Sequence, residues 1–469
     1  MLTKEQRRVV DEVMSHPTKI IAVNSVAGSG KTSTADAVIR TYAPKQGFYT
    51  AFNKAIVTDS AKRFGKLIEA KTIHSLAYKH VRPTRPIEEF NYLTIKEDIS
   101  YDDKNTIITI LDDFFRSSST DITEYIKSKC SNPDLQELIE EYANKMLDNK
   151  ISPTFNYMLK CLHLMLYYKQ LQLDFDLFVL DECQDTTAVT LEIFKLINAD
   201  VKIMLGDTYQ NIYSFMNTVN AFEELDDVKL LRLTKSFRCN PNIAEIVETY
   251  GRKHLDNDFL YYGNPKVESG PSIAYITRTN AMLIERMFNL IQQNQSFTLT
   301  RSVQEIFGLP LALLNASQGR EVFDKKFKYL EKEYIRYQLV KSRYTNYYDY
   351  IVQITEDTLL ENIIRMLQDF NTKRINIYKL KENVTNLRPN PNVILTTAHA
   401  FKGLEADTVY IENDLNSSVN RAIISMNEIA KITGGNPRDY LTKDRKEDLN
   451  TYYVALSRAR TSLVNYNYL

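Results

Sequence analysis

No tryptophan occurs in this sequence of 469 residues, and cysteine is scarce. The cysteines form no Cys-x-x-Cys pair, and the six histidines complete no metal-ligand spacing, so we expect neither a structural zinc site nor an iron–sulfur cluster. Without tryptophan, any aromatic side chain that stacks on a ligand must be phenylalanine or tyrosine. The four cysteines are Cys130, Cys161, Cys183 and Cys239.

An excess of charge of one sign is also missing, because 59 lysine and arginine residues balance 59 aspartate and glutamate residues. The totals therefore give no support to general polyanion binding, and any path for a nucleic acid must be a local groove. Long apolar runs are lacking too. Residues 159–168 are interrupted by Lys160 and His163 and fall short of the roughly 20 residues that span a bilayer, so we expect no membrane association.

The N-terminus and the length place the protein in a broad class. Residues 1–8 enter a polar amphipathic helix without the apolar stretch of a signal peptide, so we expect a cytoplasmic protein that is not secreted. A hydrophobic content of 43% fits a globular protein. A chain of this length exceeds one compact core and predicts about two to four domains.

The most informative segment is residues 24–33, Asn-Ser-Val-Ala-Gly-Ser-Gly-Lys-Thr-Ser, which follows an apolar run and precedes a helical pattern. Gly28 and Gly30 allow backbone N–H groups to turn towards phosphate oxygens. Lys31 would reach the β and γ phosphates, and the Thr32 hydroxyl would ligate Mg²⁺. The predicted ATP contacts of this loop are Ala27, Gly28, Ser29, Gly30, Lys31, Thr32 and Ser33.

This segment departs from the strict phosphate-loop pattern at its first position, where Ser25 replaces glycine. The alternative is a glycine-rich turn between a strand and a helix. The order of strand, glycines, Gly-Lys-Thr and helix favours the phosphate loop. Because many classes of enzyme use such a loop, it does not name the reaction.

A second acidic segment indicates hydrolysis. The apolar residues 177–180 run directly into Asp181 and Glu182. An aspartate at the end of a buried strand can hold Mg²⁺ through water, and an adjacent glutamate can orient and deprotonate the attacking water. The alternative is an acidic loop after a core strand, which the phosphate loop earlier in the chain disfavours.

Alternating strand and helix patterns predict an α/β fold. Strand signals occur at residues 47–51, 177–180 and 202–205, and again at 273–277, 392–396 and 408–411. A second α/β unit begins near Leu230 on this interpretation. Long amphipathic helical patterns between the strand signals indicate inserted helical segments.

The residues Asp181 to Asp185, read as Asp-Glu-x-Gln-Asp, resemble superfamily 1 helicases of the UvrD, Rep and PcrA type. Further segments match the motifs of that family in its order. Gln6 lies where the family reads adenine, and Thr72-Ile73-His74 resembles its first DNA-contact motif. Residues 206–213 resemble its coupling motif, in which Gln210 would sense the γ phosphate.

The second half of the chain carries three further motifs of this family. In Ser236-Phe237-Arg238, the resemblance implies that Phe237 stacks on adenine and Arg238 points at the γ phosphate. In residues 397–405, Glu405 matches the ribose ligand. In residues 453–459, Arg458 matches a second arginine of the ATP site. Thr397 and His399 match residues that contact DNA.

The resemblance implies an α/β fold with two RecA-like P-loop domains, each with a parallel sheet and each interrupted by a mainly helical inserted domain. We expect residues 1–80 and 175–222 to form the first RecA-like ATPase domain, with residues 81–174 as its insert. Residues 223–292 and 392–469 would form the second RecA-like domain, with residues 293–391 as its insert.

The resemblance also implies an ATP-dependent single-stranded DNA translocase and DNA helicase that moves 3′ to 5′. Its cofactors would be ATP and Mg²⁺, with Thr32 and Asp181 as metal ligands. Its partners would be single-stranded DNA and junctions between single-stranded and duplex DNA, with replication or recombination proteins as candidates, and we expect a monomer. The predicted catalytic residues are Lys31, Asp181, Glu182, Gln210, Arg238 and Arg458.

Several residues are predicted DNA contacts, and some of them point to one branch of the family. Ala51-Phe52-Asn53-Lys54 and the pattern of Thr154, Tyr157 and Lys160 are more similar to the F-box DNA helicases than to UvrD. No F-box is visible, and a compact viral or mobile-element relative fits the short chain. The predicted DNA contacts are Phe52, Asn53, Lys54, Thr72, His74, Tyr213, Phe215, Thr397 and His399.

Two other functions stay open at this point. Met216 and Asn217 stand where relatives have Arg-Gly, which is compatible with a translocase that removes proteins such as recombinase filaments from DNA and unwinds duplex weakly. A kinase with a phosphate loop, or a nucleotide-switch module, is the alternative from another class. The acidic segment at Asp181 and the two arginines argue against it.

Overall fold

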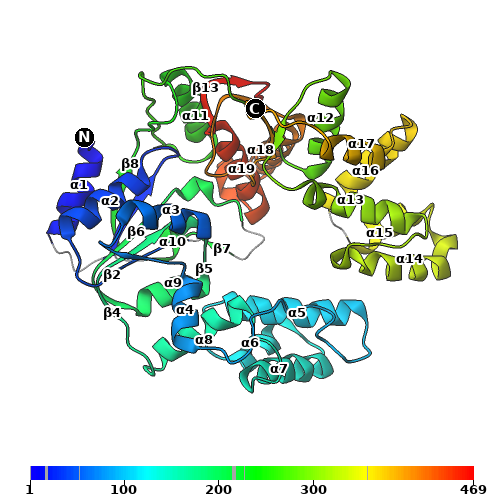
Figure 1. Ribbon diagram of the computed structural model, residues 1–469, viewed down its shortest axis with the longest axis horizontal. Coiled ribbons are helices and arrows are strands. Elements are labelled where there is room, and N and C mark those ends of the chain that lie inside the picture. Colours follow the sequence, from blue (N-terminus) through cyan, green and yellow to red (C-terminus); the bar gives the residue numbers. More distant parts are fainter. Residues whose placement is uncertain are drawn as a thin grey trace. The chain divides into compact units, whose positions relative to one another are not determined.

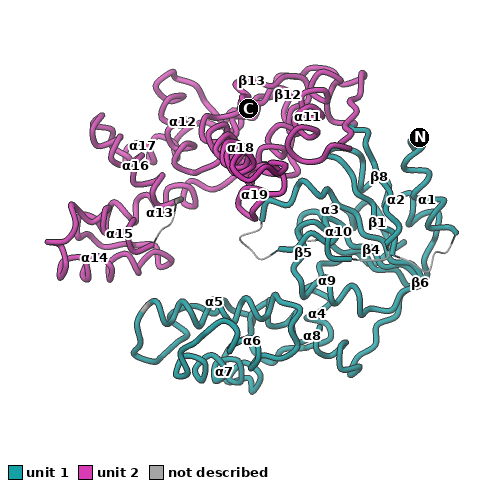
Figure 2. The backbone as a smooth tube through the Cα atoms, turned by 180° about the vertical axis from the view of Figure 1, so that it is seen from behind, with its two compact units in different colours: residues 1–236 teal, residues 237–469 magenta. Residues whose placement is uncertain are grey.

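The computed structural model describes residues 2–15, 20–51, 53–213, 218–225, 228–355 and 358–468. The chain divides into two compact units, residues 1–236 and residues 237–469 (Figure 2). Each unit contains a large parallel sheet and a set of helices (Figure 1). In the described part of the chain, no helix is both long enough and apolar enough to cross a membrane.

The first unit is built on a six-stranded sheet in which all neighbouring strands are parallel. Its strand order is β3-β2-β4-β6-β1-β8. The central strands carry apolar runs that are buried on both faces, as parallel sheets require. The strands are β1 (Ile20–Ser25), β2 (Gly47–Ala51), β3 (Glu69–Ala70), β4 (Asp174–Asp181), β6 (Asn198–Gly206) and β8 (Val228–Leu233).

Helices cover both faces of this sheet. On one face, α1 (Lys4–Met14), α2 (Lys31–Tyr42) and α3 (Lys54–Phe64) share an apolar core with β1 and β6. On the other face, α4 (Ile73–Val81), α8 (Phe155–Tyr167) and α9 (Ala188–Leu196) share a second core. Two short strands, β5 (Thr186–Thr187) and β7 (Thr218–Val219), pair antiparallel, and α10 (Ala221–Glu224) follows them.

A helical segment separates α4 from α8 in the chain. It contains α5 (Tyr101–Arg116), α6 (Ile122–Lys129) and α7 (Pro133–Leu147), which enclose a core of their own around Ile107 and Ile139. Asparagine at N-cap position 132 and proline at position 133 start α7, because proline fits the first turn of a helix. This segment lies within the predicted insert 81–174, whose bounds stay a prediction.

The second unit contains a five-stranded parallel sheet with the order β10-β11-β9-β12-β13. Its helices are α11 (Pro241–His254), α12 (Asn280–Gln292), α18 (Asn413–Thr433) and α19 (Lys443–Leu456). Its strands are β9 (Ile273–Thr277), β10 (Thr298–Leu299), β11 (Val393–Thr397), β12 (Ala406–Ile411) and β13 (Ala459–Val464). Between β10 and β11 lie α13 (Val303–Ser317), α14 (Tyr329–Val340), α15 (Tyr347–Thr355), α16 (Thr358–Thr372) and α17 (Ile377–Thr385).

The predicted α/β class with two parallel sheets is confirmed. The predicted start of the second domain at residue 223 requires a correction. Strand β8 pairs with β1 from Val228 to Leu233, and the two compact units divide after Ser236. Strand β10 also differs from the prediction, because it pairs with β11 although it lies in the predicted insert 293–391. Pairing with a distant strand decides both assignments, and local sequence patterns do not report it.

Candidate active site

The phosphate loop connects β1 to α2 in the first unit. Gly28 and Gly30 have φ angles of 74° and 82°, a left-handed conformation that glycine adopts without strain. Gly30 is the N-cap of α2, so this helix begins with no side chain bonded to its first backbone N–H groups. Such a helix N-terminus is suited to bind phosphate. The loop therefore has the backbone conformation that the sequence predicts.

Ser25, the departure from the strict motif, lies at the end of β1. Its hydroxyl donates a hydrogen bond of 2.7 Å to the carbonyl of Gly206 in the neighbouring strand β6. Its side chain is thus directed to the sheet and fits at a position where the strict motif has glycine. Gln6, the predicted adenine reader, is buried, and its amide nitrogen lies 3.4 Å from the carbonyl oxygen of Ser29 in the loop.

Lys31 of the loop pairs with Glu182. The Lys31 Nζ lies 3.2 Å from both carboxylate oxygens of Glu182. Burial lowers the pKa of Lys31, but the surrounding carboxylates, chiefly Glu182, outweigh that effect and raise the pKa above its ordinary value. The structure thus brings a charged lysine from the phosphate loop against the predicted catalytic glutamate.

Asp181 is buried at the carboxyl end of β4, and its carboxylate accepts hydrogen bonds from two groups. The Tyr49 hydroxyl donates to Asp181 Oδ2 at 2.5 Å, and the backbone N–H of Glu182 donates to Oδ1 at 2.9 Å. Burial and the neighbouring Glu182 carboxylate raise the pKa of Asp181. Ser60 donates to the Tyr49 hydroxyl at 3.1 Å, which orients it.

Glu182 has an unusual backbone conformation, with a φ angle of 53°. Residues other than glycine rarely adopt the left-handed region, and strained positions of this kind concentrate at functional sites. The turn after β4 therefore directs the Glu182 side chain towards Lys31.

A hydrogen-bond network connects Glu182 to the coupling motif. The Gln184 amide donates to Glu182 Oε2 at 2.7 Å and accepts from the backbone N–H of Asp207 at 3.0 Å. The Gln210 amide donates to Asp207 Oδ2 at 2.7 Å. A Cβ atom on Gly206 would lie 2.5 Å from Gln184 Oε1, so this network requires glycine there. The predicted phosphate sensor Gln210 is thereby joined to Glu182, the predicted catalytic carboxylate.

The side chains of Thr32 and Asp181 fit the chemistry of Mg²⁺ in a nucleotide site. Mg²⁺ takes oxygen ligands and is usually held by one or two protein groups together with substrate phosphates. A hydroxyl at the first turn of α2 and a carboxylate at the end of β4 are such groups. Among the described residues, no cluster of three histidine, cysteine, aspartate or glutamate side chains forms a separate metal site.

The structure gives local contacts for most predicted DNA contacts of the first unit. Thr72 and Asn53 are helix N-caps, and each side chain accepts a backbone hydrogen bond. Lys54 is exposed.

Burial lowers the pKa of His74 to about 4, so this imidazole is neutral near pH 7. It is hydrogen-bonded to Asn156, and its ring is in edge contact with the ring of Phe155. Burial, with Asp185 and Glu182, raises the pKa of Tyr213 to about 12. Phe52 and Phe215 lie outside the described residues.

The second unit gathers several predicted ATP contacts. The Arg238 Nε donates to Glu405 Oε2 at 2.8 Å, and its Nη1 donates to the carbonyl of Ser457 at 3.1 Å. Arg460 lies on the other side of this carboxylate, with its Nε 3.6 Å from Glu405 Oε1. Asp407 anchors Arg460 through a hydrogen bond of 2.8 Å. Two arginines therefore share the predicted ribose ligand.

Arg458 has a different environment from Arg238. It is 1% exposed and donates to the carbonyl of Val454 at 3.0 Å and to the Ser457 hydroxyl at 3.0 Å. These acceptors lie in the last turn of α19 and at its C-cap, where a cation is favoured by the helix dipole. Val454, Ser457 and Leu404, which accept hydrogen bonds from Arg458, belong to the second unit.

The other predicted residues of the second unit lie at its surface or at strand ends. Phe237 is 41% exposed. Thr397 ends β11 and accepts a hydrogen bond from the backbone N–H of Ala400 at 3.3 Å. The His399 Nε2 lies 3.9 Å from Glu447 Oε1. The assignment of Thr397 and His399 to DNA stays a prediction.

The sequence did not predict some residues that contact the predicted site residues. Tyr49 and Arg460 are the clearest, because they contact Asp181 and Glu405 from other parts of the chain. Tyr49 precedes the Ala51–Lys54 segment by two positions, but no spacing rule points to it. Asp207 is part of the coupling motif, and its neighbour Gly206 could have drawn attention to it.

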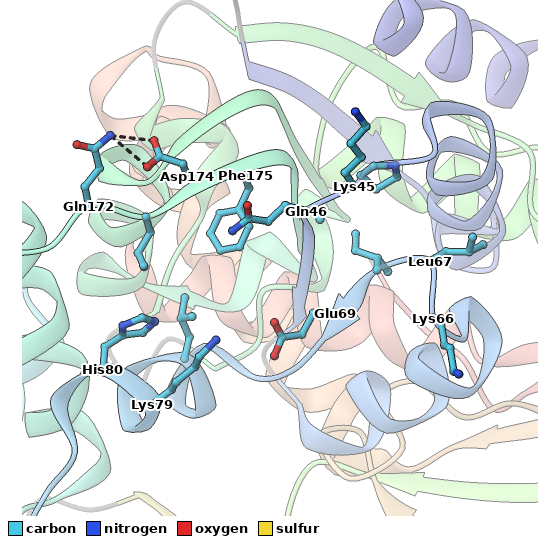
Figure 3. Close-up of a pocket in the computed structure, with 15 residues that line it drawn as sticks. Lys45, Gln46, Lys66, Leu67, Glu69, Lys79, His80, Gln172, Asp174 and Phe175 are labelled. Atoms are coloured by element: carbon cyan, nitrogen blue, oxygen red, sulfur yellow. Dashed lines mark hydrogen bonds between the residues drawn. The ribbon is translucent and has the colours of Figure 1, made fainter.

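A separate cavity of about 470 Å³ lies where β2 and β4 begin, at the opposite end of these strands from Asp181. Figure 3 shows Lys45, Lys79 and His80 around it, with Glu69 between them. Gln172 donates to both carboxylate oxygens of Asp174, at 2.9 and 3.1 Å (Figure 3). Since parallel strands present their carboxyl ends at one edge, this cavity is not part of the nucleotide site.

Comparison with known proteins agrees with this geometry. Residues 6–216 match the AAA domain family. The chain is 25% identical to F-box DNA helicase 1 of Gallus gallus over 505 aligned positions, which include 99% of this chain and 49% of that protein. It is 26% identical to F-box DNA helicase protein 1 of Schizosaccharomyces pombe over 537 positions, which include 99% of this chain and 57% of that protein. The chain spans about half the length of the curated relatives it matches. The predicted resemblance is confirmed.

Proposed function

We propose that this chain, which carries an AAA domain and is a distant relative of the F-box DNA helicases of superfamily 1, is an ATP-driven DNA translocase and helicase. The observation that carries the proposal is the contact between Lys31 of the phosphate loop and Glu182, beside the buried Asp181. This arrangement would combine phosphate binding with a base for water in one site. The similarity to two DNA helicases supports DNA as the track.

In the first unit, Lys31 would transfer from Glu182 to the β and γ phosphates of ATP. The carboxylate of Glu182 would then orient a water molecule and take its proton. Mg²⁺, held by Thr32 and Asp181, would neutralise charge on the phosphates. Gln210 would report the γ phosphate, since Asp207 and Gln184 connect it to Glu182.

In the second unit, Arg238 would supply positive charge to the transferring phosphoryl group. An arginine in that role is worth on the order of 10³ to 10⁵ in rate. Glu405 holds Arg238 in this structure, and Arg460 offers a second cation for that carboxylate when Arg238 moves to phosphate. Arg458 would act from the end of α19, and Phe237 would stack on adenine.

Movement along DNA would follow from closure of the two units around ATP and their opening after hydrolysis. Alternating closure converts turnover into steps when each unit holds the strand separately. Tracking without sequence preference needs backbone contacts and aromatic stacking, and tyrosine and phenylalanine must supply the stacking here. By resemblance we propose 3′ to 5′ movement.

The proposal is tested with Lys31→Ala and Glu182→Gln, and Glu137→Gln on the exposed surface of α7 is the matched control. DNA-stimulated ATPase and strand displacement are measured together. We expect each site variant to reduce turnover at least a hundredfold, because each removes a group that contacts the reacting phosphate or water. The control should keep full activity. If both activities survive in the site variants, the assignment is wrong.

The same assays separate the helicase from its alternatives. ATPase is titrated with single-stranded DNA, single-stranded RNA and duplex at stated salt, because phosphate contacts make affinity salt-dependent. Clearance of a recombinase filament without displacement of a tailed duplex would identify a protein-removing translocase. Turnover that no polynucleotide stimulates would favour a nucleotide-switch module or a kinase.

A further inference from the structure

A cavity of about 200 Å³ lies in the first unit, directly beside the catalytic carboxylates. Its walls come from the carboxyl ends of β2 and β4 on one side and from α4 and α8 on the other. Asp181 and Glu182 line it, together with Asn156 of α8 and Arg116 of α5. The proposed hydrolysis mechanism makes no use of this space.

The lining is mainly apolar, with hydroxyl groups among the hydrocarbon. Ile73, Leu159 and Leu180 supply aliphatic surface, and five threonines supply methyl groups and hydroxyls. One hydroxyl stands out. Thr50 is 1% exposed, and its Oγ1 has no hydrogen-bond partner among the described residues. A buried hydroxyl without a partner is costly, so an occupant that bonds to Thr50 would be stabilised.

Thr50 faces this cavity because of its place in β2. Neighbouring residues of a strand point to opposite faces of the sheet. Phe48 belongs to the core shared with α4 and α8, and Tyr49 belongs to the core on the other face. Thr50 therefore lies on the same face as Phe48, which is the face that lines the cavity.

The charges around the cavity exclude an anion. Asp181 and Glu182 are carboxylates at its wall, and they would repel phosphate. Arg116, a cation that also lines the cavity, is paired with Asp112 at 2.7 Å. His74 is neutral and is hydrogen-bonded to Asn156. An uncharged occupant fits this environment, and the volume is below the roughly 300 Å³ of sites for drug-sized ligands.

We propose that this cavity binds one neutral, planar heterocycle of nucleobase size, with a polar edge at Thr50 and its faces against Ile73 and Leu159. The ligand is either a base of a bound strand or a free small molecule of the same chemistry. This inference rests on the proposed function where it concerns DNA, and the binding site itself does not depend on it.

Occupancy would act on hydrolysis through direct contact. Leu180, Asp181 and Glu182 are consecutive residues at the end of β4, and all three line the cavity. A ring against Leu180 would restrict the strained turn at Glu182, whose carboxylate contacts Lys31. Binding of the heterocycle would thereby stimulate ATP turnover without touching the nucleotide.

The test uses the full chain and 2-aminopurine, a fluorescent heterocycle, both free and placed within a single-stranded oligonucleotide. Thr50→Val removes the hydroxyl with nearly the same shape, and Leu159→Phe fills the cavity. Thr58→Val on the exposed face of α3 is the control. We expect a fluorescence change on binding that Thr50→Val weakens about fivefold in affinity, that Leu159→Phe abolishes, and that Thr58→Val leaves unchanged.

The outcomes distinguish a strand base from a free small molecule as the ligand. A response from the oligonucleotide alone assigns the site to a base of the strand, and a response from the free heterocycle assigns it to a small molecule. If neither response depends on Thr50 or Leu159, the inference is overturned. Should Leu159→Phe fail to fold, Thr50→Val still carries the test. Failure of the proposed function is seen separately, as DNA that does not stimulate the ATPase of the unaltered chain.

Strands with abasic sites give an independent measurement. We expect an abasic oligonucleotide to stimulate the ATPase at least tenfold less than a base-containing strand of equal length. Thr50→Val should reduce the stimulation by the base-containing strand and leave turnover without DNA unchanged. Equal stimulation by both strands would rule out a strand base as the ligand.

Discussion

Single side chains decide which partners the two carboxylates of this site have. Glu182 is held in a left-handed backbone conformation and faces Lys31, while Asp181 accepts hydrogen bonds from the Tyr49 hydroxyl and a backbone N–H. The two adjacent carboxylates therefore have different partners, one suited to catalysis and the other to holding a metal. The difference arises from residues that are distant in the sequence.

Replacing Tyr49 with phenylalanine tests this division at Asp181. The change removes the hydroxyl that donates to Asp181 Oδ2 at 2.5 Å, and a lost hydrogen bond to a charged group is worth about 1.5–3 kcal/mol. We expect the Mg²⁺ concentration that gives half-maximal ATPase to shift about tenfold or more. Tyr42→Phe is the control, since the Tyr42 hydroxyl contacts the carbonyl of Asp176 instead. Equal behaviour of the two variants would contradict the role of Tyr49.

Helix α8 joins the helical segment to the sheet. Lys160 on this helix is 2% exposed, and its Nζ donates to the carbonyls of Ser117 and Ser119 at 2.7 Å each, above the ring of Phe114. Burial lowers the pKa of Lys160 to about 7. The ammonium group thus satisfies carbonyls just beyond the C-terminal end of α5, a position that the helix dipole favours for a cation.

Lys160→Met should destabilise the first unit, because it leaves two partly buried carbonyls without their Lys160 donor. We expect a loss of about 1–3 kcal/mol in unfolding free energy, measured by thermal or urea denaturation. Lys127→Met on the exposed side of α6 is the matched control and should change stability by less than about 0.5 kcal/mol. If both variants unfold alike, Lys160 does not fasten these helices.

The same helix makes the first unit sensitive to acid. His163 is 1% exposed, its Nδ1 has no hydrogen-bond partner among the described residues, and burial lowers its pKa to about 4 from 6.5. The unfolded chain therefore binds a proton first, and stability falls as the pH drops from 6.5 towards 4. A shift of this size corresponds to about 3 kcal/mol at the end of that range.

His163→Leu removes this titration, since leucine has no proton to bind. We expect the free energy of unfolding of the variant to decline less steeply between pH 6.5 and 4 than that of the unaltered chain, as followed by urea denaturation at several pH values. His74 has a similarly lowered pKa and keeps part of the decline. An unchanged slope would show that His163 is not buried in its neutral form.

At the scale of the whole molecule, the proposed motor depends on two units that each carry part of the predicted ATP contacts. Lys31, Asp181 and Glu182 lie in the first unit, and Arg238 and Arg458 lie in the second. Neither unit contains the complete predicted set. Hydrolysis would therefore report the closure of the molecule around ATP.

Arg458→Ala tests that dependence. We expect ATP binding to stay largely intact and turnover to fall at least a hundredfold, because an arginine on the transferring phosphoryl group acts mainly in the transition state. Nucleotide binding and turnover are measured side by side. Arg421→Ala, on the exposed surface of α18, is the control. Since Arg458 is buried, a denaturation curve shows whether the variant is folded, and retained turnover would remove Arg458 from the mechanism.

Local sequence patterns predicted the helices and strands of this fold, because such elements depend on residues that are neighbours in the chain. The strands at 47–51 and 273–277 have the predicted bounds in the structure. The boundary between the units does not lie at the predicted position. Strand β8 follows that position in the sequence, but it hydrogen-bonds to β1 of the first unit. The division into inserts stays a prediction, and Phe52 and Phe215 lie outside the described residues.

The sequence by itself determined the phosphate loop and the acidic strand end, since Gly28, Gly30, Lys31, Asp181 and Glu182 act through local conformation and chemical type. The tertiary structure alone decided which partners these groups have. The Tyr49–Asp181 contact, the shared carboxylate of Glu405 and the cavity beside Leu180 each join segments that are far apart in the chain. Such contacts follow from strand pairing and helix packing, which no spacing of residues along the sequence can specify.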